Sequence, residues 1–190
     1  MSVDRRQLII DAATKSFSLF GYKATTMDQV AKLANVGKGT IYTFFSNKVE
    51  LLDEIVTSLI KEMKAAAEET IRDDQSFYTN VNRAIYRLLA FKNEHQLTIK
   101  LFHEEKEIGT PEVIEVMAKV ENAIIHYIKE KVQEAIDKDE IKDCDPEMTA
   151  FIMLKLYITF VNDWEKNHQP LSKEEITSLF EFYLFRGLSK

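Results

Sequence analysis

The side chains around residue 40 offer the clearest chemistry in this 190-residue sequence. Lys38, Thr40, Tyr42 and Thr43 can all donate hydrogen bonds, whereas Ile41 and Phe45 are expected to point to a core. A short helix with flexible donors near its N-terminus can reach base edges and phosphates in the major groove of DNA. We therefore predict that a helix at about 38–44 reads nucleic acid.

Two glycines stand at the expected start of this helix. Gly37 and Gly39 leave the backbone uncovered, so N–H groups at the helix N-terminus can approach a phosphate. The sequence Gly-Lys-Gly-Thr also resembles part of a nucleotide-binding loop, but the upstream glycine of that loop is missing and no strand is expected before it. We therefore expect a phosphate of DNA at this position and not a nucleoside triphosphate.

Two short helices are expected to position these side chains. Thr26 can cap the first of them, and Gln29 can reach back to the backbone of Thr26, which is typical of a helix start. Residues 35–37 end that helix, and the second runs from about Lys38 to Phe44. Two short helices joined by a turn that contains glycine are typical of a helix-turn-helix unit.

Longer helices are expected on both sides of this unit. The preceding helix ends at Gly21, where a glycine suits the C-cap. Asn47, with Glu50 three residues later, predicts the start of a helix over about 48–70. The apolar face of the preceding helix consists of Ile9, Ala12, Ala13, Phe17 and Phe20.

The charge of the chain is unevenly distributed. Residues 1–50 contain seven basic and four acidic side chains, a net charge of +3, although the whole chain has a net charge of −6. The remaining residues therefore have a net charge of −9. This asymmetry favours a small nucleic-acid-binding module on an acidic body.

The rest of the sequence predicts an all-α fold. Only 5 Gly and 3 Pro are present, which leaves few residues for the turns of a β-sandwich or barrel. Residues 97–101 alternate between apolar and polar, but a helix is expected there because no partner strand is predicted. We expect nine helices and no sheet.

The two final helices, at about 146–166 and 172–188, are apolar around nearly their whole circumference. Such a helix has to be covered on all sides. Two helices from each of two subunits would provide this cover in a four-helix interface, so we predict a homodimer. The alternative is a single monomer core that surrounds both helices.

Many residues of the first 60 fall at fixed positions in one register without a gap. They are Ile9, Ala12, Ala13, Phe17, Gly21, Tyr22, Ala24, Thr25, Thr26, Val30, Ala31, Ala34, Val36, Gly39, Thr40, Ile41, Tyr42, Phe44, Phe45, Lys48 and Leu51. This pattern resembles the TetR family of bacterial transcriptional regulators. The resemblance implies a nine-helix fold with a helix-turn-helix DNA-binding domain at 1–47, linked by the helix at about 48–70, and a ligand-binding and dimerisation domain at 48–190.

The resemblance also implies roles for single residues. Thr26, Tyr42 and Lys48 would contact the DNA backbone, whereas Arg5 and Arg6 would either reach a nearby phosphate or minor groove or remain solvated. The expected DNA-binding residues together are Thr26, Lys38, Gly39, Thr40, Tyr42, Thr43 and Lys48.

Two residues depart from the pattern of the family. Gly37 lacks the hydroxyl that usually caps the second short helix, and Phe44 replaces a residue that can bond to phosphate. We therefore expect individual contacts to be lost but the module to be kept.

The predicted function is that of a sequence-specific transcriptional regulator, a repressor released from a palindromic operator by a small apolar ligand. The alternative is a helical interaction protein of the same fold that does not bind an operator. The expected ligand pocket is lined by Tyr86, Phe102, Tyr127, Phe160 and Trp164.

Other functions are not supported by the sequence. We expect no enzyme activity, because no arrangement of catalytic acids, bases or nucleophiles can be identified. Cys144 is the single cysteine, the four histidines are widely spaced, and no cofactor or metal is expected. No apolar run is long enough to span a membrane, and we expect a cytoplasmic protein.

Overall fold

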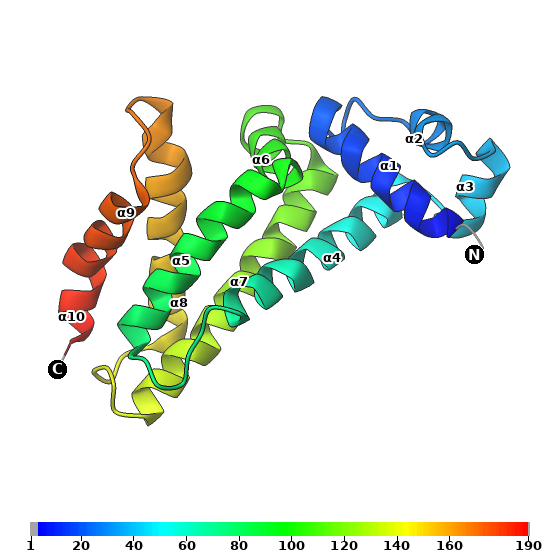
Figure 1. The fold of residues 1–190 in the computed structure, drawn as a ribbon. Coiled ribbons are helices and arrows are strands. Elements are labelled where there is room, and N and C mark those ends of the chain that lie inside the picture. The colour runs from blue at the N-terminus through cyan, green and yellow to red at the C-terminus, as the bar shows by residue number, and fades with distance from the viewer. Residues whose placement is uncertain (1–3, 190) are drawn as a thin grey trace. The chain divides into compact units, whose positions relative to one another are not determined.

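The structure is a computed structural model that describes residues 4–189, apart from the side chain of Asn93. Within this range the chain is helical and contains no strand, as expected (Figure 1). The short helices α2 and α3 match the two predicted short helices. The α-helices are α1 (Arg5–Phe20), α2 (Met27–Leu33), α3 (Lys38–Phe44), α4 (Lys48–Glu68), α5 (Phe77–Glu94), α6 (Gln96–His103), α7 (Pro111–Asp137), α8 (Pro146–Ile158), α9 (Lys173–Phe180) and α10 (Arg186–Leu188).

Three of these helices continue without a break into π-helical or 3-10 helical segments. A π-helical segment, η1 (Glu104–Ile108), extends α6. The segments η2 (Thr159–Asp163) and η3 (Trp164–Lys166) extend α8, and η4 (Glu181–Phe185) joins α9 to α10. When each continued helix is counted once, the described residues form the nine helices that the sequence predicts.

Local side-chain bonds define where the helices begin. The Thr26 hydroxyl accepts from the backbone N–H of Gln29, and the Gln29 side chain accepts from the backbone N–H of Thr26. Ser172 and Glu175 make the same reciprocal pair at the start of α9. Such caps satisfy N–H groups that have no partner inside the helix.

The chain forms two compact units, which do not follow a single division of the sequence. The first consists of the residues up to Glu62 together with Lys92–Val120, and the second of Met63–Phe91 together with the residues from Glu121 onward. The helices α4 and α7 each contribute to both units. The functional domain boundary expected at residue 47 remains a prediction.

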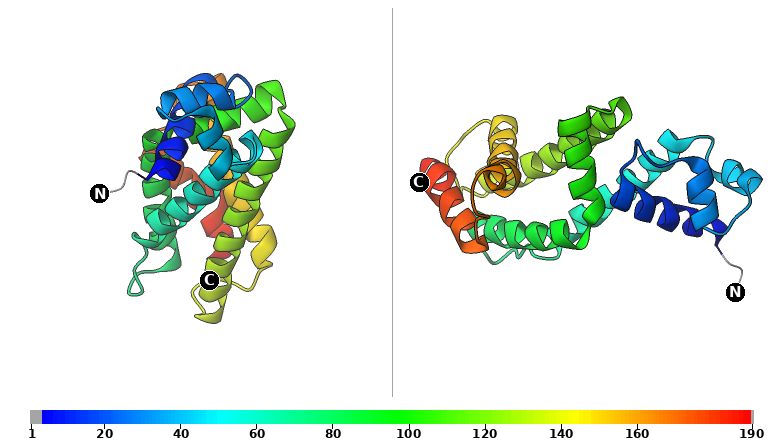
Figure 2. Two further views of the ribbon diagram at one scale, coloured as in Figure 1. Left: turned by 90° about the vertical axis from the view of Figure 1, so that its right-hand side faces the viewer. Right: turned by 90° about the horizontal axis from the view of Figure 1, so that it is seen from above.

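The core of the first unit is built by α1, α2, α3 and α6 together with parts of α4 and α7, and the first three lie together at the blue end of the ribbon (Figures 1 and 2). Burial of their apolar faces is the main stabilising contribution. Phe20 belongs to the same face of α1 but is 66% exposed, since it is the last residue of the helix. The buried residues include Ile9, Ala13, Phe17, Val30, Ile41, Phe45, Leu51 and Leu101.

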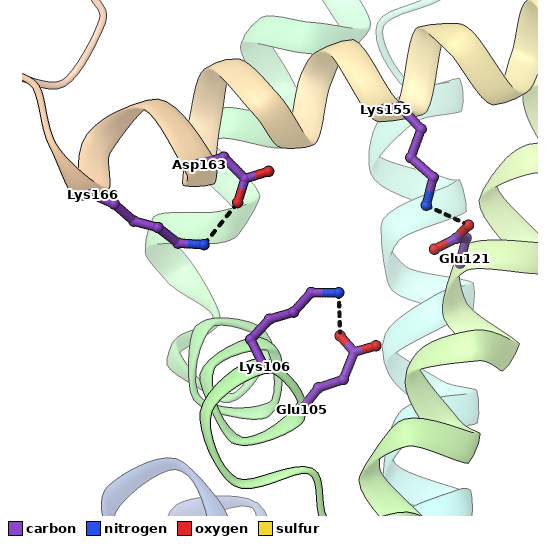
Figure 3. A network of polar contacts seen from close by, with 6 residues as sticks. All are labelled: Glu105, Lys106, Glu121, Lys155, Asp163 and Lys166. Atoms are coloured by element: carbon purple, nitrogen blue, oxygen red, sulfur yellow. Dashed lines mark hydrogen bonds and ion pairs between the residues drawn. The ribbon is translucent and has the colours of Figure 1, made fainter.

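The second unit has its own core. The rings of Phe160 in η2 and Phe180 in α9 meet edge to face, with centroids 5.9 Å apart, and so pack the two C-terminal helices together. Lys155 of α8 forms an ion pair with Glu121 of α7 at 2.7 Å (Figure 3). The α8 helix is thus held by apolar contact on one side and by a charged contact to α7.

The outer faces of the two C-terminal helices remain apolar and uncovered in the single chain. Phe182 is 56% exposed and Tyr183 is 64% exposed, although both belong to a helix that also contributes buried residues. Exposed groups of this kind mark surfaces that contact other molecules. The remaining large apolar side chains exposed on these helices are Met148, Phe151, Ile152 and Trp164.

None of the described helices is long and apolar enough to cross a lipid bilayer.

Candidate nucleic-acid interface

The turn between α2 and α3 lies at residues 35–37, as expected, and contains Gly37. The left-handed residue is Asn35, with φ of 53°, whereas Gly37 has φ of −66° and an extended backbone. Asn adopts this conformation more readily than most residues because its short side chain can bond locally. Gly37 is the N-cap of α3 and has no side chain to bond there, as expected from the sequence.

One side of α3 packs into the core, and the other side is exposed to solvent. Ile41 is fully buried and Phe45, directly after the helix, is almost so. Lys38, Gly39 and Thr43 are exposed, Thr40 is half-buried, and Tyr42 is 46% exposed. The donor side chains predicted at 38–44 therefore lie together on one accessible helix. Their contacts to DNA remain predictions.

Lys38 is engaged in an ion pair. Its Nζ lies 2.8 Å from Oδ2 of Asp28 on α2, and both side chains are largely exposed. The hydrogen bond to Asp28 and its charge raise the pKa of Lys38. Exposed ion pairs contribute little to stability because water and salt screen them, so this lysine can exchange Asp28 for a DNA group at small cost.

Lys48, at the start of α4, is bound to the turn between α1 and α2. Its Nζ donates to the carbonyl oxygens of Tyr22 and Thr25, both at 2.8 Å, and lies 4.1 Å from the centroid of the Tyr22 ring. Burial lowers the pKa of Lys48, and the nearby charges of Glu104 and Glu112 oppose this effect. Lys48 thus fixes the segment that leads to Thr26.

Glu104, in η1, is a residue that the sequence analysis missed. It is only 3% exposed, and its carboxylate accepts from the backbone N–H groups of Tyr22 at 2.7 Å and Lys23 at 2.8 Å. The hydroxyl of Thr110 donates to it at 3.0 Å. No local sequence signal could have identified it, because Glu104 lies in a run of charged residues that is typical of a solvated surface.

Gly21 makes this contact possible. Its φ of 88° is one that L-residues rarely adopt, and a Cβ there would lie 2.7 Å from Oε2 of Glu104. Thr25 completes the turn, because its hydroxyl donates to the carbonyl of Gly21 and bonds to the buried Ser16 hydroxyl. The turn before α2 is therefore held by side chains from α1, α4 and η1.

The residues expected in a ligand pocket have different surroundings. Phe102 belongs to the first unit, where its ring meets the edge of His103. In the second unit, Phe160 lies in the core. Trp164 is 40% exposed, and its ring stacks on the His168 ring with centroids 3.8 Å apart. Their role in ligand binding remains a prediction.

Two tyrosines complete the predicted pocket residues. The Tyr86 hydroxyl donates to Glu174 at 3.4 Å. Lys64 lies over the ring of Tyr127, at 5.6 Å from its centroid, and burial and the charge of Glu68 raise the pKa of the Tyr127 hydroxyl.

Potential metal ligands do not gather in the structure. In the range 4–189, no three His, Cys, Asp or Glu side chains are close enough together to hold an ion.

These features together define a helix-turn-helix protein of the DNA-binding class, with an accessible second helix fixed by a buried framework. Comparison with known families agrees with this class. Residues 9–55 match bacterial regulatory proteins of the tetR family, and residues 74–188 match the tetracyclin repressor-like C-terminal domain. The chain belongs to the TetR family and is a helix-turn-helix transcriptional regulator.

Individual relatives agree with this assignment. The chain is 60% identical over 189 residues to an uncharacterized HTH-type transcriptional regulator, YhgD of Bacillus subtilis, covering 100% of this chain and 99% of YhgD.

Two solved structures of low sequence identity share the fold. FadR of Bacillus subtilis in complex with stearoyl-CoA has a TM-score of 0.73 and 21% identity, covering 91% of this chain and 92% of FadR. The SmeT–triclosan complex has a TM-score of 0.76 and 18% identity, covering 98% of this chain and 92% of SmeT.

Proposed function

We propose that this chain is a dimeric repressor that binds a palindromic operator through α3 and leaves it when a small, largely apolar ligand binds to the body. The observation that supports DNA reading most directly is the accessible face of α3, whose donors stand on a helix held by the buried Ile41. A helix in this position of a helix-turn-helix unit enters the major groove.

The residues of the site divide into two groups. We assign Lys38, Thr40 and Thr43 to contacts with bases or the nearby backbone. Thr26, Gly39, Tyr42 and Lys48 are assigned to the phosphates, which fix the position of the helix without reading sequence. In the absence of DNA, Lys48 already holds the backbone of the turn, so its effect on phosphate binding combines contact and positioning.

The uncovered apolar faces support dimerisation. Phe151, Ile152, Phe182 and Tyr183 are all exposed on the C-terminal helices, which suits a four-helix interface between two subunits. Two-fold symmetry would then place the two α3 helices in successive major grooves, about 34–36 Å apart. The uncovered apolar faces are therefore the observation that favours a palindromic operator.

The ligand is proposed by similarity. The FadR and SmeT structures of the same fold contain stearoyl-CoA and triclosan, both of which have a large apolar part. Release of the operator would require that the ligand bind more tightly to a dimer with wrongly spaced α3 helices than to the DNA-bound one. We place the protein in the cytoplasm, where it can reach the bacterial chromosome.

The test is operator binding by fluorescence anisotropy, with DNA from upstream of the gene for this chain and a scrambled duplex as control. The wild type should prefer the upstream DNA. Replacement of Lys38, Thr40 and Thr43 together by Ala should remove this preference, because each specific contact contributes about 1–3 kcal/mol of discrimination. Tyr42→Phe should instead weaken binding to both duplexes similarly.

The alternative function, a helical interaction protein without an operator, predicts a different result. Wild-type and triple-variant proteins would then bind both duplexes equally weakly at physiological salt. A steep loss of affinity with salt for both duplexes, without preference, would indicate charge attraction alone.

A further inference from the structure

A groove runs along α5 in the second unit. Its volume is about 640 Å³, and its walls come from Glu69, Thr70 and Arg72 in the segment after α4 and from one face of α5 between Thr79 and Ala90. A cavity of this size can hold a small molecule or a large part of one.

The groove is rich in arginine. Arg72, Arg83 and Arg87 line it, which is half of the six arginines in the chain. Arg83 and Arg87 are four residues apart and therefore share one face of α5. Because the part of the chain after residue 50 has a net charge of −9, this cluster is not a portion of a generally basic surface.

Charged groups other than arginine also lie near the groove. Glu69 is the acidic residue among its lining residues. From α9, Glu174 accepts from the Tyr86 hydroxyl, and Lys173 lies 5.9 Å from the centroid of the Tyr86 ring. Among the residues that the structure describes, no ion pair of Arg72 or Arg83 is found, so their guanidinium groups can bind a ligand.

Arginine favours a particular class of ligand. Its planar guanidinium group donates two parallel hydrogen bonds to phosphate or carboxylate oxygens. Asn82 also lines the groove, and its Oδ1 is buried without a hydrogen-bond partner among the described residues. An unpaired buried acceptor is costly, and a ligand with an N–H or O–H group would satisfy it.

We propose that this groove binds a phosphate ester that also carries hydroxyl or amino groups, as a nucleotide does. The guanidinium groups of Arg72 and Arg83 bind the phosphate oxygens, and the amide of Asn82 bonds to a donor of the same ligand. This inference deepens the proposed function and rests on it only for the link to operator release, since the groove would hold the anionic head of the effector.

The binding test uses the full chain without DNA and isothermal titration calorimetry. The probes are ADP, inorganic phosphate, and adenosine, which has the donors of ADP but no charge. ADP should bind more tightly than phosphate, and adenosine should bind least. Arg83→Ala should weaken ADP binding by about tenfold or more, because hydrogen bonds between charged groups are lost.

The matched control is Lys138→Ala, which removes one exposed positive charge from the same unit outside the groove. Its affinity for ADP should equal that of the wild type. Equal losses in Arg83→Ala and Lys138→Ala would overturn the proposal, because they would show general charge attraction. Failure of ADP to bind at millimolar concentration would overturn it as well.

A second pair of probes identifies the source of the phosphate. If the groove holds the head of an amphipathic effector, Arg83→Ala should weaken binding of stearoyl-coenzyme A but not of stearate. If stearoyl-coenzyme A is unaffected while ADP is weakened, the ligand is a free nucleotide. Operator binding is measured separately, so a wild-type protein that binds the operator but neither ADP nor stearoyl-coenzyme A refutes this inference and leaves the proposed function standing.

Discussion

Glu104 Oε2 lies 2.7 Å from the backbone nitrogen of Tyr22, although 82 positions separate the two residues in sequence. The carboxylate is buried and also accepts from the N–H of Lys23. Hydrogen bonds to a charged acceptor are stronger than those between neutral groups. The turn that leads into α2 and α3 is therefore held by a residue from the segment after α6.

Glu104→Ala should lower the free energy of unfolding by about 2–4 kcal/mol, because two N–H groups lose their acceptor in a largely buried place. Glu104→Gln, which keeps an acceptor oxygen, should cost less. Chemical denaturation measures both. The control is the neighbouring Glu105→Ala, whose partner is Lys106 (Figure 3). An equal loss in Glu104→Ala and Glu105→Ala would contradict the role of Glu104.

Gly21→Ala should also destabilise the protein, by about 2 kcal/mol or more, because it forces an L-residue into a positive φ. Its Cβ would in addition displace the Glu104 carboxylate. The two changes act on one contact, so the loss in the double variant with Glu104→Ala should be smaller than the sum of the single losses. Strict additivity, measured by the same denaturation, would show that they are independent.

Asp28→Asn should strengthen DNA binding severalfold. It releases Lys38 from its ion pair and removes a negative charge near the phosphates, and the salt dependence of binding should become steeper. Stability should change little, since the pair is exposed. Asp11→Asn removes the same charge from α1 and serves as the control in anisotropy titrations against salt. If both variants gain equally, the effect is one of net charge and not of Lys38.

Stability should fall at high pH in a way that depends on Tyr22. Burial, with the charges of Glu112 and Glu104, raises the pKa of Tyr22 to about 12, above its usual 10.0. The folded state therefore keeps the proton longer than the unfolded state, and this contribution is complete below pH 10.0 and lost as the pH rises to about 12. Denaturation of wild type and Tyr22→Phe across this range measures it. The variant should lose less stability, and parallel losses would contradict the assignment.

Phe182→Asp should shift the protein toward monomer, because a charge would be buried at the proposed dimer interface. Sedimentation velocity at several protein concentrations measures the change. Phe20→Asp is a suitable control, since Phe20 is also largely exposed but lies at the end of α1. A dimer that survives Phe182→Asp at low concentration would place the interface elsewhere.

The sequence predicts the helices well because their signals are local. The reciprocal caps at Thr26 and Ser172 connect residues only three apart, and the structure contains both. Gly109, with φ of 69°, and Pro111, the first residue of α7, likewise separate η1 from α7 by local signals. The alternating segment at 97–101 is helical in α6, which confirms the choice made from the lack of a partner strand.

Periodicity is less informative about whether a side chain is covered. It places Phe20 on the apolar face of α1, but burial requires a neighbour on that side of the last turn, and Phe20 is 66% exposed. The sequence likewise places a turn at residues 35–37, but only the structure shows that Asn35 is its residue with positive φ. Both features depend on how the elements meet and not on their own composition.

The sequence by itself therefore determined the helical class, the helix boundaries, the accessible donors of α3 and the membership of the TetR family. Only the tertiary structure decided which charges are paired: Lys38 with Asp28, Lys48 with two carbonyls, and Glu104 with the turn after Gly21. The physical reason is range. Helix signals act over about four residues, whereas these bonds join residues 10 to 82 positions apart, which only folding brings together.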